Sequence, residues 1–418
     1  MNFSINHWHG DEDEAEVLVN RAIRFLHRNA VKSPKMSIIL HDKERILIEM
    51  DINDFPTPHI PSKLPIETII QEIITDQTFL KLSFSAVSNL SGFMGYLQNL
   101  PNPEILISSL TLQESVLSSK IEGTIATLSD VVEDSPTSET IKNDIVEIKN
   151  YVEAVKFGHE ELHDRNFQFS SYLIRTLHSI LLTNNVRGAN KCPGKFKTEQ
   201  NYIRNDAIGN FTPLPPILTS EYIDNLVDYI NNYEEMTPIL QAGIAHVQFE
   251  MIHPFQDGNG RIGRLLIPLI LYAKELLPFP TFYISRYFSS NEDIYKKCLS
   301  EVSKSSTPEA LLNAWKNWLT FFFNGIKEES VRHIETSKKI MKLSDEIRGA
   351  IKRTDQLEII NYLFDNLWIE PSEFSKTSSL SSSTIYSTLR NLSQMGFITR
   401  TGSERKTRYV FTKLVDIL

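Results

Sequence analysis

Apolar residues recur every three or four positions along much of the chain, and this spacing is typical of amphipathic helices. Residues 172–182 and 222–233 follow the pattern, and the clearest series is Ile141, Ile145, Ile148, Val152 and Val155. A further helix is rich in aromatic residues that we expect in the core, namely Trp315, Trp318, Leu319, Phe321 and Phe322. The pattern predicts a mainly α-helical protein.

The helical pattern changes in two places. Between Asn184 and Pro216 several glycines and prolines gather, which predicts a hairpin or an irregular loop set among helices. From Ser337 to Lys352 the residues are polar and charged, and we expect a helical connector. We therefore predict an N-terminal helical region over 1–134, a helical core over 135–336, a connector over 337–353 and a small domain over 354–418.

Composition narrows the class of protein. Hydrophobic residues make up 41% of the chain and charged residues 23%, an ordinary soluble globular balance. The net charge of -9 argues against nucleic acid or an anionic membrane as the main partner. Cys192 and Cys298 are too few for a disulfide framework or a zinc site and fit a reducing compartment. The longest apolar stretch, Leu265–Ala273, is far below the ~20 residues of a membrane helix. With an acidic N-terminus, these features predict a cytoplasmic protein.

The segment His253-Pro-Phe-Gln-Asp-Gly-Asn-Gly-Arg-Ile-Gly-Arg264 joins two apolar helices. Pro254 stops the first helix, and we expect the second helix to start near Ile262. Gly258 and Gly260 allow the chain to curl with its backbone N–H groups pointing inward. A glycine-containing turn at a helix N-terminus is a site for anions such as phosphate.

The side chains of this loop fit one chemistry. Arg261 and Arg264 add fixed positive charge suited to phosphate oxygens. Asp257 supplies a hard oxygen ligand for Mg²⁺, which often binds through one carboxylate plus phosphates and water. His253 has an ordinary pKa near neutrality, so it is suited to take a proton from an attacking hydroxyl. A single short loop thus holds a base, a metal ligand and a phosphate cradle.

The same string is similar to the Fic signature HPFx(D/E)GNGRxxR and matches it at every defined position. The resemblance implies a protein adenylyltransferase, which moves AMP from ATP onto protein hydroxyls with Mg²⁺ or Mn²⁺. It implies that His253 is the base and that Asp257 is the metal ligand. It also implies that Gly258, Asn259 and Gly260 cradle the phosphates and that Arg261 and Arg264 bind the triphosphate. A kinase-like branch departs from the glycine-rich pattern that this chain keeps, which favours nucleotidyl transfer.

A second motif lies upstream, in a predicted helix that Gly123 closes. A glutamate at a helix C-terminus meets the negative end of the helix dipole, so Glu122 is expected to have a cationic partner. The segment Ser118-Ser-Lys-Ile-Glu122-Gly123 resembles the inhibitory motif (S/T)xxxE(G/N) of the same family. That resemblance implies that Glu122 pairs with Arg264 and keeps the γ-phosphate of ATP from binding productively.

Two further assignments rest on the resemblance. Residues 195–203 resemble the family flap, a hairpin that holds the target segment by strand addition, here with Lys197, Thr198, Glu199, Gln200 and Asn201. Tyr295 stands where relatives often carry a tyrosine near the adenine, although Lys296 replaces a second tyrosine and core packing of Tyr295 is an equal alternative. We interpret His246 as packed or exposed rather than as a metal ligand, since it lies seven residues before His253.

The C-terminal domain is predicted to contain helices over 357–363, 371–377 and 381–395, then strands over 397–400 and 408–412. This order resembles a winged helix-turn-helix. Arg400, Arg405, Lys406 and Arg408 cluster at the wing, but acidic and basic residues are about balanced, so we favour a protein-interaction or dimer-forming role over DNA binding.

The predicted fold class is therefore mainly α, with a helical Fic core, a short β-hairpin flap and a C-terminal winged-helix domain. The expected partners are ATP and the Ser, Thr or Tyr hydroxyls of target proteins. Self-modification and homodimers are implied by the resemblance. Two alternatives stay open: an enzyme that removes AMP with the same site, and a DNA-binding regulator whose Fic core senses nucleotide.

Overall fold

The computed structural model describes residues 56–100, 103–133, 138–184, 186–204, 208–351, 353–402 and 407–418. The chain forms two compact units, one of Ile60–Asn201 with Pro213–Leu418 and the other of Met1–His59 with Tyr202–Thr212. In the second unit the described residues make one isolated β-bridge, between Ile203 and Phe211. The residues before 56 lie outside the described part of the chain, so the predicted region 1–134 is described only from residue 56.

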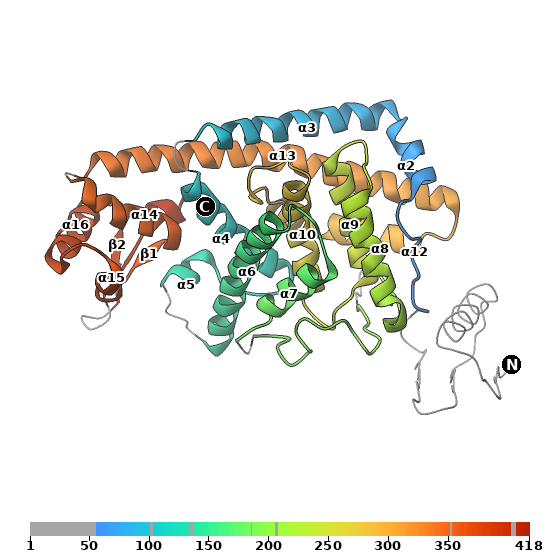
Figure 1. Cartoon of the computed structure of the whole chain (residues 1–418), viewed down its shortest axis with the longest axis horizontal. Coiled ribbons are helices and arrows are strands. Elements are labelled where there is room, and N and C mark those ends of the chain that lie inside the picture. Colours follow the sequence, from blue (N-terminus) through green and yellow to red (C-terminus); the bar gives the residue numbers. More distant parts are fainter. Residues whose placement is uncertain are drawn as a thin grey trace. The chain divides into compact units, whose positions relative to one another are not determined.

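The first unit is mainly helical, as the sequence predicts (Figure 1). Up to residue 304 its helices are α2 (Glu67–Ile74), α3 (Gln77–Gln98), α4 (Glu104–Ile121), α5 (Leu128–Glu133), α6 (Glu139–Asp164), α7 (Ser171–Leu181), the 3-10 turn η1 (Pro216–Leu218), α8 (Thr219–Asn232), α9 (Pro238–Ile252), α10 (Asn259–Ala273), α11 (Ser285–Ser290) and α12 (Glu292–Lys304). The isoleucine series forms the buried face of α6, which begins where the Ser138 side chain accepts a hydrogen bond from Ile141 N.

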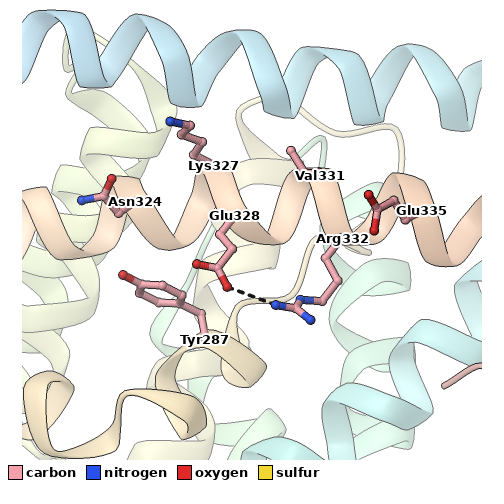
Figure 2. A pocket seen from close by; sticks show the side chains of 7 residues that line it. All are labelled: Tyr287, Asn324, Lys327, Glu328, Val331, Arg332 and Glu335. Carbon is pink, nitrogen blue, oxygen red and sulfur yellow. Dashed lines mark hydrogen bonds and ion pairs between the residues drawn. The ribbon is translucent and has the colours of Figure 1, made fainter.

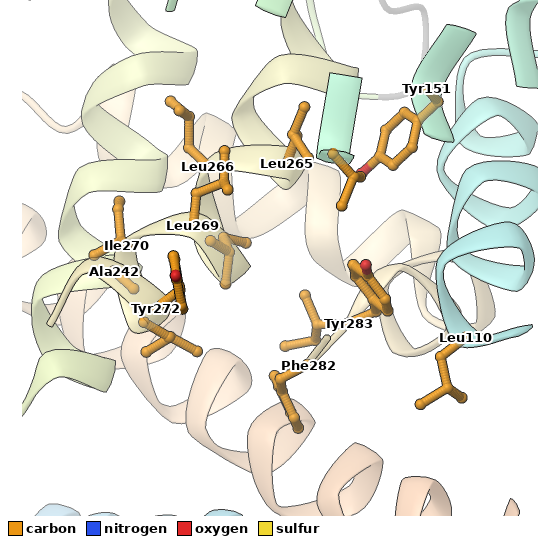
Figure 3. Packing of buried hydrophobic residues seen from close by; sticks show 14 of the residues in the cluster. Leu110, Tyr151, Ala242, Leu265, Leu266, Leu269, Ile270, Tyr272, Phe282 and Tyr283 are labelled. Carbon is orange, nitrogen blue, oxygen red and sulfur yellow. The ribbon is translucent and has the colours of Figure 1, made fainter. Parts of the chain in front are cut away.

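Helices α9 and α10 form the centre of the core. Nearly every residue of both helices is buried, so neither has a solvent face. They pack on each other and α10 also packs on α6 and α4. Figure 3 shows Leu265, Leu266 and Leu269 of α10 in this cluster. Each fully buried leucine contributes about 1.5–3 kcal/mol. The loop between α9 and α10 is therefore held between two rigid, buried elements.

Helix α13 (Pro308–Gly349) runs through the predicted boundary between core and connector. It lies parallel to α3: Phe79 contacts Phe323, and Phe93 further along α3 contacts His333 (Figure 1). Its residues Trp315, Trp318, Leu319, Phe321 and Phe322 are buried, as predicted. Beyond residue 336 the helix still buries Ile340, Leu343 and Ile347, so the predicted connector is the last third of one packed helix.

The last part of the chain contains the five predicted elements and three more, η2, β1 and α17. Its elements are η2 (Thr354–Gln356), α14 (Leu357–Asn366), β1 (Trp368–Ile369), α15 (Pro371–Thr377), α16 (Ser382–Gln394), β2 (Thr399–Thr401), β3 (Arg408–Val410) and α17 (Thr412–Val415). The strands form an antiparallel sheet of order β1-β3-β2, in which Ile369 and Arg400 both pair with Tyr409. The additional strand β1 has two residues, too few for an alternating pattern to be read from sequence.

Within the described part of the chain, no helix combines the length and apolarity that a bilayer crossing requires. The region predicted as hairpin or loop, residues 184–216, contains the 3-10 start at Pro216 and is otherwise without helix or extended strand where it is described. Two polar side chains of this stretch bond to its neighbours: Lys197 donates to Ile252 O at the end of α9, and Asn201 donates to Phe255 O in the loop between α9 and α10.

Candidate active site

The loop between α9 and α10 is shorter than predicted, because α10 begins at Asn259 and not near Ile262. His253 ends α9 in a left-handed conformation with φ of 49°, and Gly258 precedes α10 with φ of 76°. The Asn259 side chain closes the turn, since its Oδ1 accepts from Phe255 N at 2.8 Å and its Nδ2 donates to Phe255 O at 2.7 Å. Asn259 is buried and committed to these bonds, so its observed contacts hold the loop in shape.

The N-terminus of α10 is an anion site in the physical sense. Gly258 occupies the N-cap position and offers no side-chain acceptor to the first N–H groups of the helix. Those N–H groups carry the positive end of the helix dipole and lack partners within the helix. A phosphate-sized anion placed there would accept hydrogen bonds from these N–H groups.

His178 of α7 packs against the loop between α9 and α10 and bonds to it. Its ring stacks on Phe255 with the centroids 3.7 Å apart. Its Nδ1 accepts from Gly194 N at 2.9 Å and its Nε2 lies 2.9 Å from Asp257 O, which fixes the neutral tautomer with hydrogen on Nε2. Burial lowers the pKa of His178 to about 4, in agreement with a neutral ring. Sequence analysis missed this residue.

His253 is largely buried and neutral. Its backbone N donates to Phe249 O at 2.8 Å, and its Nδ1 lies 3.8 Å from Glu250 Oε2. Burial and the Lys197 cation lower the pKa of His253 to about 3, against the opposing influence of Glu122. At neutral pH the imidazole therefore has an unprotonated nitrogen with which to accept a proton.

The residues predicted as a flap contact the loop directly. Lys197 Nζ donates to Ile252 O and to Asn201 Oδ1, each at 3.0 Å, and Lys197 N donates to Pro254 O. Asn201 Nδ2 donates to His253 O and Phe255 O. Burial lowers the pKa of Lys197 to about 7. The side chains of Lys197 and Asn201 thus hold the catalytic loop.

The other residues of the predicted flap differ in exposure. Thr198 and Glu199 are exposed, and Glu199 O accepts from Gln256 Nε2 at 2.7 Å. Gln200 donates to Pro213 O at 3.0 Å. Their role in docking a target stays a prediction, and the exposed residues are the ones open to a partner.

Arg261 is fully buried and paired with a residue that sequence analysis missed. Its Nη1 donates to Glu147 Oε2 of α6 at 2.6 Å, and its Nη2 lies 4.0 Å from Asp257 Oδ1. Burial raises the pKa of Glu147, while Arg261 and Arg187 act against that rise. Arg261 Nη2 and Nε are buried without a hydrogen-bond partner, so the guanidinium has donors left for an anion.

Arg264 contacts Ser118 and Glu122, the pairing that the resemblance implies. Its Nη2 donates to Glu122 Oε1 at 2.8 Å and to Ser118 O at 2.8 Å, and its Nε donates to Ser118 Oγ at 3.0 Å. Burial favours a raised pKa for Glu122, but Arg264 outweighs it and holds the pKa below its ordinary value. The cationic partner expected from the helix dipole is Arg264.

The glycines of this region make room for the glutamate. Helix α4 ends at Ile121, and Gly123 has φ of 90°, as expected for a residue that terminates a helix. A Cβ on Gly260 would lie 2.2 Å from Glu122 Oε1 and 3.0 Å from Arg264 Nη1. Gly260 is helical, so its lack of a side chain serves close approach and not a turn.

Asp257 is the candidate metal ligand. Its side chain is 35% exposed beside the N-terminus of α10, and its Oδ1 accepts from Gly258 N at 2.7 Å. Among the described residues there is no group of three or more His, Cys, Asp or Glu side chains arranged around a common metal position. A single accessible carboxylate beside a phosphate site fits Mg²⁺, which takes its remaining oxygens from phosphates and water.

Tyr295 and His246 lie in the core behind the site. Tyr295 is 3% exposed, stacks on Phe288 and contacts His246 Nε2 through its hydroxyl at 2.9 Å. His246 Nδ1 bonds to Gly263 O at 3.0 Å, so His246 is packed, in agreement with our interpretation. The observed contacts of Tyr295 are those of a residue packed in the core. Its expected place near adenine stays a prediction.

A separate cavity of about 570 Å³ lies beside α13 and α11 (Figure 2). It is lined by Tyr287, Asn324, Lys327, Glu328, Val331, Arg332 and Glu335. Arg332 donates to Glu328 across one turn of α13 at 3.0 Å, so the cavity's charges are partly paired. It shares no residue with the loop between α9 and α10, and the candidate active site is the loop.

Comparison with known proteins identifies the two regions that build this site. Residues 80–160 match the family model described as Fic/DOC family N-terminal, and residues 168–271 match that described as Fic/DOC family. The protein adenylyltransferase fic-1 of Caenorhabditis briggsae is 32% identical over 167 residues, 37% of this chain and 31% of that protein. The probable protein adenylyltransferase aq_aa38 of Aquifex aeolicus is 31% identical over 114 residues, 27% of this chain and 36% of that protein.

A solved structure agrees with the fold. The Fic domain containing signaling protein of Bacteroides thetaiotaomicron is 25% identical and superposes with a TM-score of 0.51, covering 62% of this chain and 97% of that one. The chain spans 31% and 36% of the length of the two curated relatives. The first matched region contains α4 with Glu122 and the second contains the loop from His253 to Arg264. Both regions that contribute to the candidate site, residues 80–160 and 168–271, are thus similar to the Fic/DOC family.

Proposed function

We propose that this protein is an adenylyltransferase that transfers AMP from ATP to protein hydroxyl groups. The observation that supports the proposal is the loop from His253 to Arg264, which begins with a neutral imidazole and leads into the uncapped N-terminus of α10. Two relatives that share these regions are named protein adenylyltransferase or probable protein adenylyltransferase. A base beside an anion site is what transfer of a phosphate-containing group to a hydroxyl requires.

In the proposed reaction, a hydroxyl oxygen of the target attacks the α-phosphorus of ATP. The new oxygen–phosphorus bond forms as the bond to the pyrophosphate oxygen breaks, and His253 accepts the hydroxyl proton. Negative charge grows on the pyrophosphate, and the groups proposed to stabilise it are the α10 N–H groups and the unpaired donors of Arg261. These groups are fixed before reaction, so they stabilise the developing charge without reorganisation.

Asp257 is the residue that would hold Mg²⁺ or Mn²⁺. When bound, the metal would supply positive charge that offsets the negative charge of the nucleotide phosphates. The protein's part is to orient the carboxylate, which the Gly258 N–H does through Asp257 Oδ1.

The proposed resting state is inhibited by Glu122. The carboxylate of Glu122 occupies Arg264, which the γ-phosphate would otherwise contact. Because the pair is largely buried and Ser118 also binds Arg264, nucleotide phosphate must compete with a preformed partner. We expect removal of the carboxylate to raise activity, and this is the first of our testable predictions.

The test is AMP transfer from α-labelled ATP with Mg²⁺, measured on Glu122→Gly, Glu122→Gly/His253→Ala and the unchanged protein. Label on protein should increase with the first change and vanish with the second. Glu346→Gly, which alters an exposed glutamate of α13, serves as the matched control and should not raise transfer. Label from γ-labelled ATP instead of α-labelled ATP would contradict nucleotidyl transfer and support a kinase.

The two alternative functions, AMP removal and DNA-binding regulation, predict different outcomes. An enzyme acting in the removal direction would release AMP from a modified protein and show little transfer in any variant. A DNA-binding regulator would show strong, salt-dependent affinity for duplex DNA. Self-modification would appear as label on the chain itself, and a homodimer as twice the monomer mass in solution.

A further inference from the structure

Arg187 lies between the inhibitory segment and the catalytic loop, and the proposed reaction does not use it. It belongs to the irregular stretch after α7, and its side chain is 47% exposed. Its Nη1 donates to Glu122 O at 2.8 Å. Its Nε lies 3.8 Å from Glu147 Oε1, whereas Glu147 Oε2 accepts from Arg261. Arg187 thus connects the main chain of Glu122 to the carboxylate that holds Arg261.

The bond to Glu122 O is favourable for a reason set by the helix. Helix α4 ends at Ile121, and the last carbonyl groups of a helix point outward with partial negative charge. A guanidinium placed at that end satisfies a carbonyl and opposes the dipole. Arg187 therefore acts as a cation at the C-terminus of the inhibitory helix.

The segment after Gly123 is held from α6 as well. Asp144 Oδ2 accepts from Ile125 N at 2.8 Å and from Ala126 N at 3.2 Å. Asp144 lies one turn before Glu147 on α6. The inhibitory segment is therefore bonded at two points, directly to Asp144 and through Arg187 to Glu147.

The neighbour of Arg187 contacts the other side of the site. Gly188 has φ of 85°, and a Cβ there would lie 2.9 Å from Asp257 Oδ2. Two consecutive residues thus contact the inhibitory helix and the candidate metal ligand. A movement of Arg187 and Gly188 would therefore change the contacts of both Glu122 and Asp257.

We propose that Arg187 is a positioning residue for Glu122, fixing the end of α4 so that the glutamate stays on Arg264. The proposal rests on the inhibitory role of Glu122 given under Proposed function. Loss of the Arg187 guanidinium removes the bond to Glu122 O but leaves the Glu122–Arg264 pair its own contacts. Inhibition should then weaken without being abolished.

The competing idea is that Arg187 binds nucleotide phosphate itself. The two ideas predict opposite signs. A phosphate ligand is needed whether or not Glu122 is present, so its loss lowers activity in every background. A residue that acts through Glu122 has nothing to act on once that carboxylate is gone.

The experiment compares Arg187→Ala in the unchanged protein and in Glu122→Gly, with initial rates of AMP transfer and the KM for ATP. In the unchanged background we expect the rate to rise about threefold to tenfold, the effect of one lost charge-assisted hydrogen bond on the inhibited state, and the KM to fall. In Glu122→Gly we expect the same rate and KM with and without Arg187. Arg165→Ala is the control, since Arg165 is 56% exposed and pairs with Glu161 within its own helix.

Two results would overturn the proposal: no rise in the unchanged background, or a fall in both backgrounds. If Arg187→Ala does not give folded protein, Arg187→Gln removes the charge on a shorter side chain and permits the same comparison. Failure of Glu122→Gly to activate would reject the inhibitory role itself, and that result is read from the single variant before Arg187 is considered. Activation by Glu122→Gly with no effect of Arg187 would reject the present inference alone.

Discussion

The catalytic-loop region and the C-terminal region from residue 353 use charge in opposite ways. Around the loop, Arg261, Arg264 and Glu147 are at most 2% exposed. In the described residues of the C-terminal region, the buried side chains are apolar apart from Thr388. Both regions fold around apolar residues, but the loop region places charges inside as well.

This difference shows where the fold contains interactions that add little to stability. Burying an ion pair costs desolvation that the pair's attraction only partly offsets, and an apolar pair of the same size is often as stable. The pairs Arg261–Glu147 and Arg264–Glu122 are therefore poorly explained by stability alone and well explained by a site that must present positive charge to an anion. The apolar interior of the C-terminal region needs no such explanation.

The largest expected effect tests the buried pair. Glu147→Gln keeps the shape of the side chain but removes the hydrogen-bonded counter-charge of the buried Arg261, leaving it, among the described residues, only the partly exposed Asp257 carboxylate 4.0 Å away. We expect a loss of about 3–5 kcal/mol in the free energy of unfolding, measured by urea denaturation, because a lone buried charge is strongly unfavourable. AMP transfer by Glu122→Gly should fall as well, since Arg261 loses its anchor.

The matched control is on the same helix. Glu161 of α6 pairs with the exposed Arg165, and Glu161→Gln should cost less than about 1 kcal/mol. Equal losses for the two variants would show that burial of Arg261 is not what makes its pair matter.

The next effect concerns the apolar interior of the C-terminal region. Leu389 of α16 is fully buried, and Leu389→Ala should cost about 2–5 kcal/mol through lost burial and a cavity. The rate of AMP transfer by the folded protein should stay within about twofold, because stability and site chemistry are separate in this region. A tenfold change in rate would mean that the region takes part in the reaction, and would favour the regulator alternative.

What the sequence could predict follows from distance along the chain. His253 to Arg264 are contiguous, so one short string is enough to propose a base, a metal ligand and phosphate-binding arginines. The helices over 172–182 and 222–233 follow from local periodicity in the same way, and their structural counterparts are α7 and α8. Local signals were less accurate for boundaries: the side chain of Asn259 closes the turn, and that bond moves the helix start three residues earlier than expected.

The supporting residues could not be predicted because they arrive from elsewhere. Glu147 lies 114 residues from Arg261, His178 lies 79 residues from Asp257, and Arg187 lies 65 residues from Glu122. In the sequence each is an ordinary polar residue on or after an amphipathic helix. The available signal was indirect: a loop with Arg261 and Arg264 but one acid needs further carboxylates from other elements. Glu122, in contrast, was predicted from its place at a helix C-terminus and from its motif.

A smaller effect depends on pH. The pKa of His178 is about 4 in the folded protein, below its ordinary value of 6.5. Between these values the unfolded chain binds a proton that the folded chain does not, so stability falls as pH drops below 6.5. From pH 7.5 to 5.5 this residue should cost about 1 kcal/mol. His178→Gln should therefore lose less stability over that interval than the unchanged protein, as measured by urea denaturation at both pH values.

Other groups titrate in the same interval. Their contribution cancels when the pH dependence of His178→Gln is subtracted from that of the unchanged protein. Burial raises the pKa of Glu114 to about 7 and that of Glu250 to about 8, and these residues act in the opposite direction. They are present in both proteins and lie outside the bonds of His178. An identical pH dependence in the two proteins would contradict a neutral, buried His178.

The smallest expected effect comes from a surface pair of the C-terminal region. Glu373 and Lys376 of α15 are 2.7 Å apart, and their side chains are 61% and 66% exposed. Water and salt screen such a pair, and Glu373 also lies in the first turn of α15, where a negative charge meets the positive end of the dipole. Glu373→Ala should cost less than about 1 kcal/mol, and in 0.5 M salt the cost should shrink because the Debye length falls to a few ångström. The Glu147→Gln loss should persist in the same salt, since ions do not reach a buried pair. A surface pair as costly and as salt-resistant as the buried one would remove the contrast between the two regions.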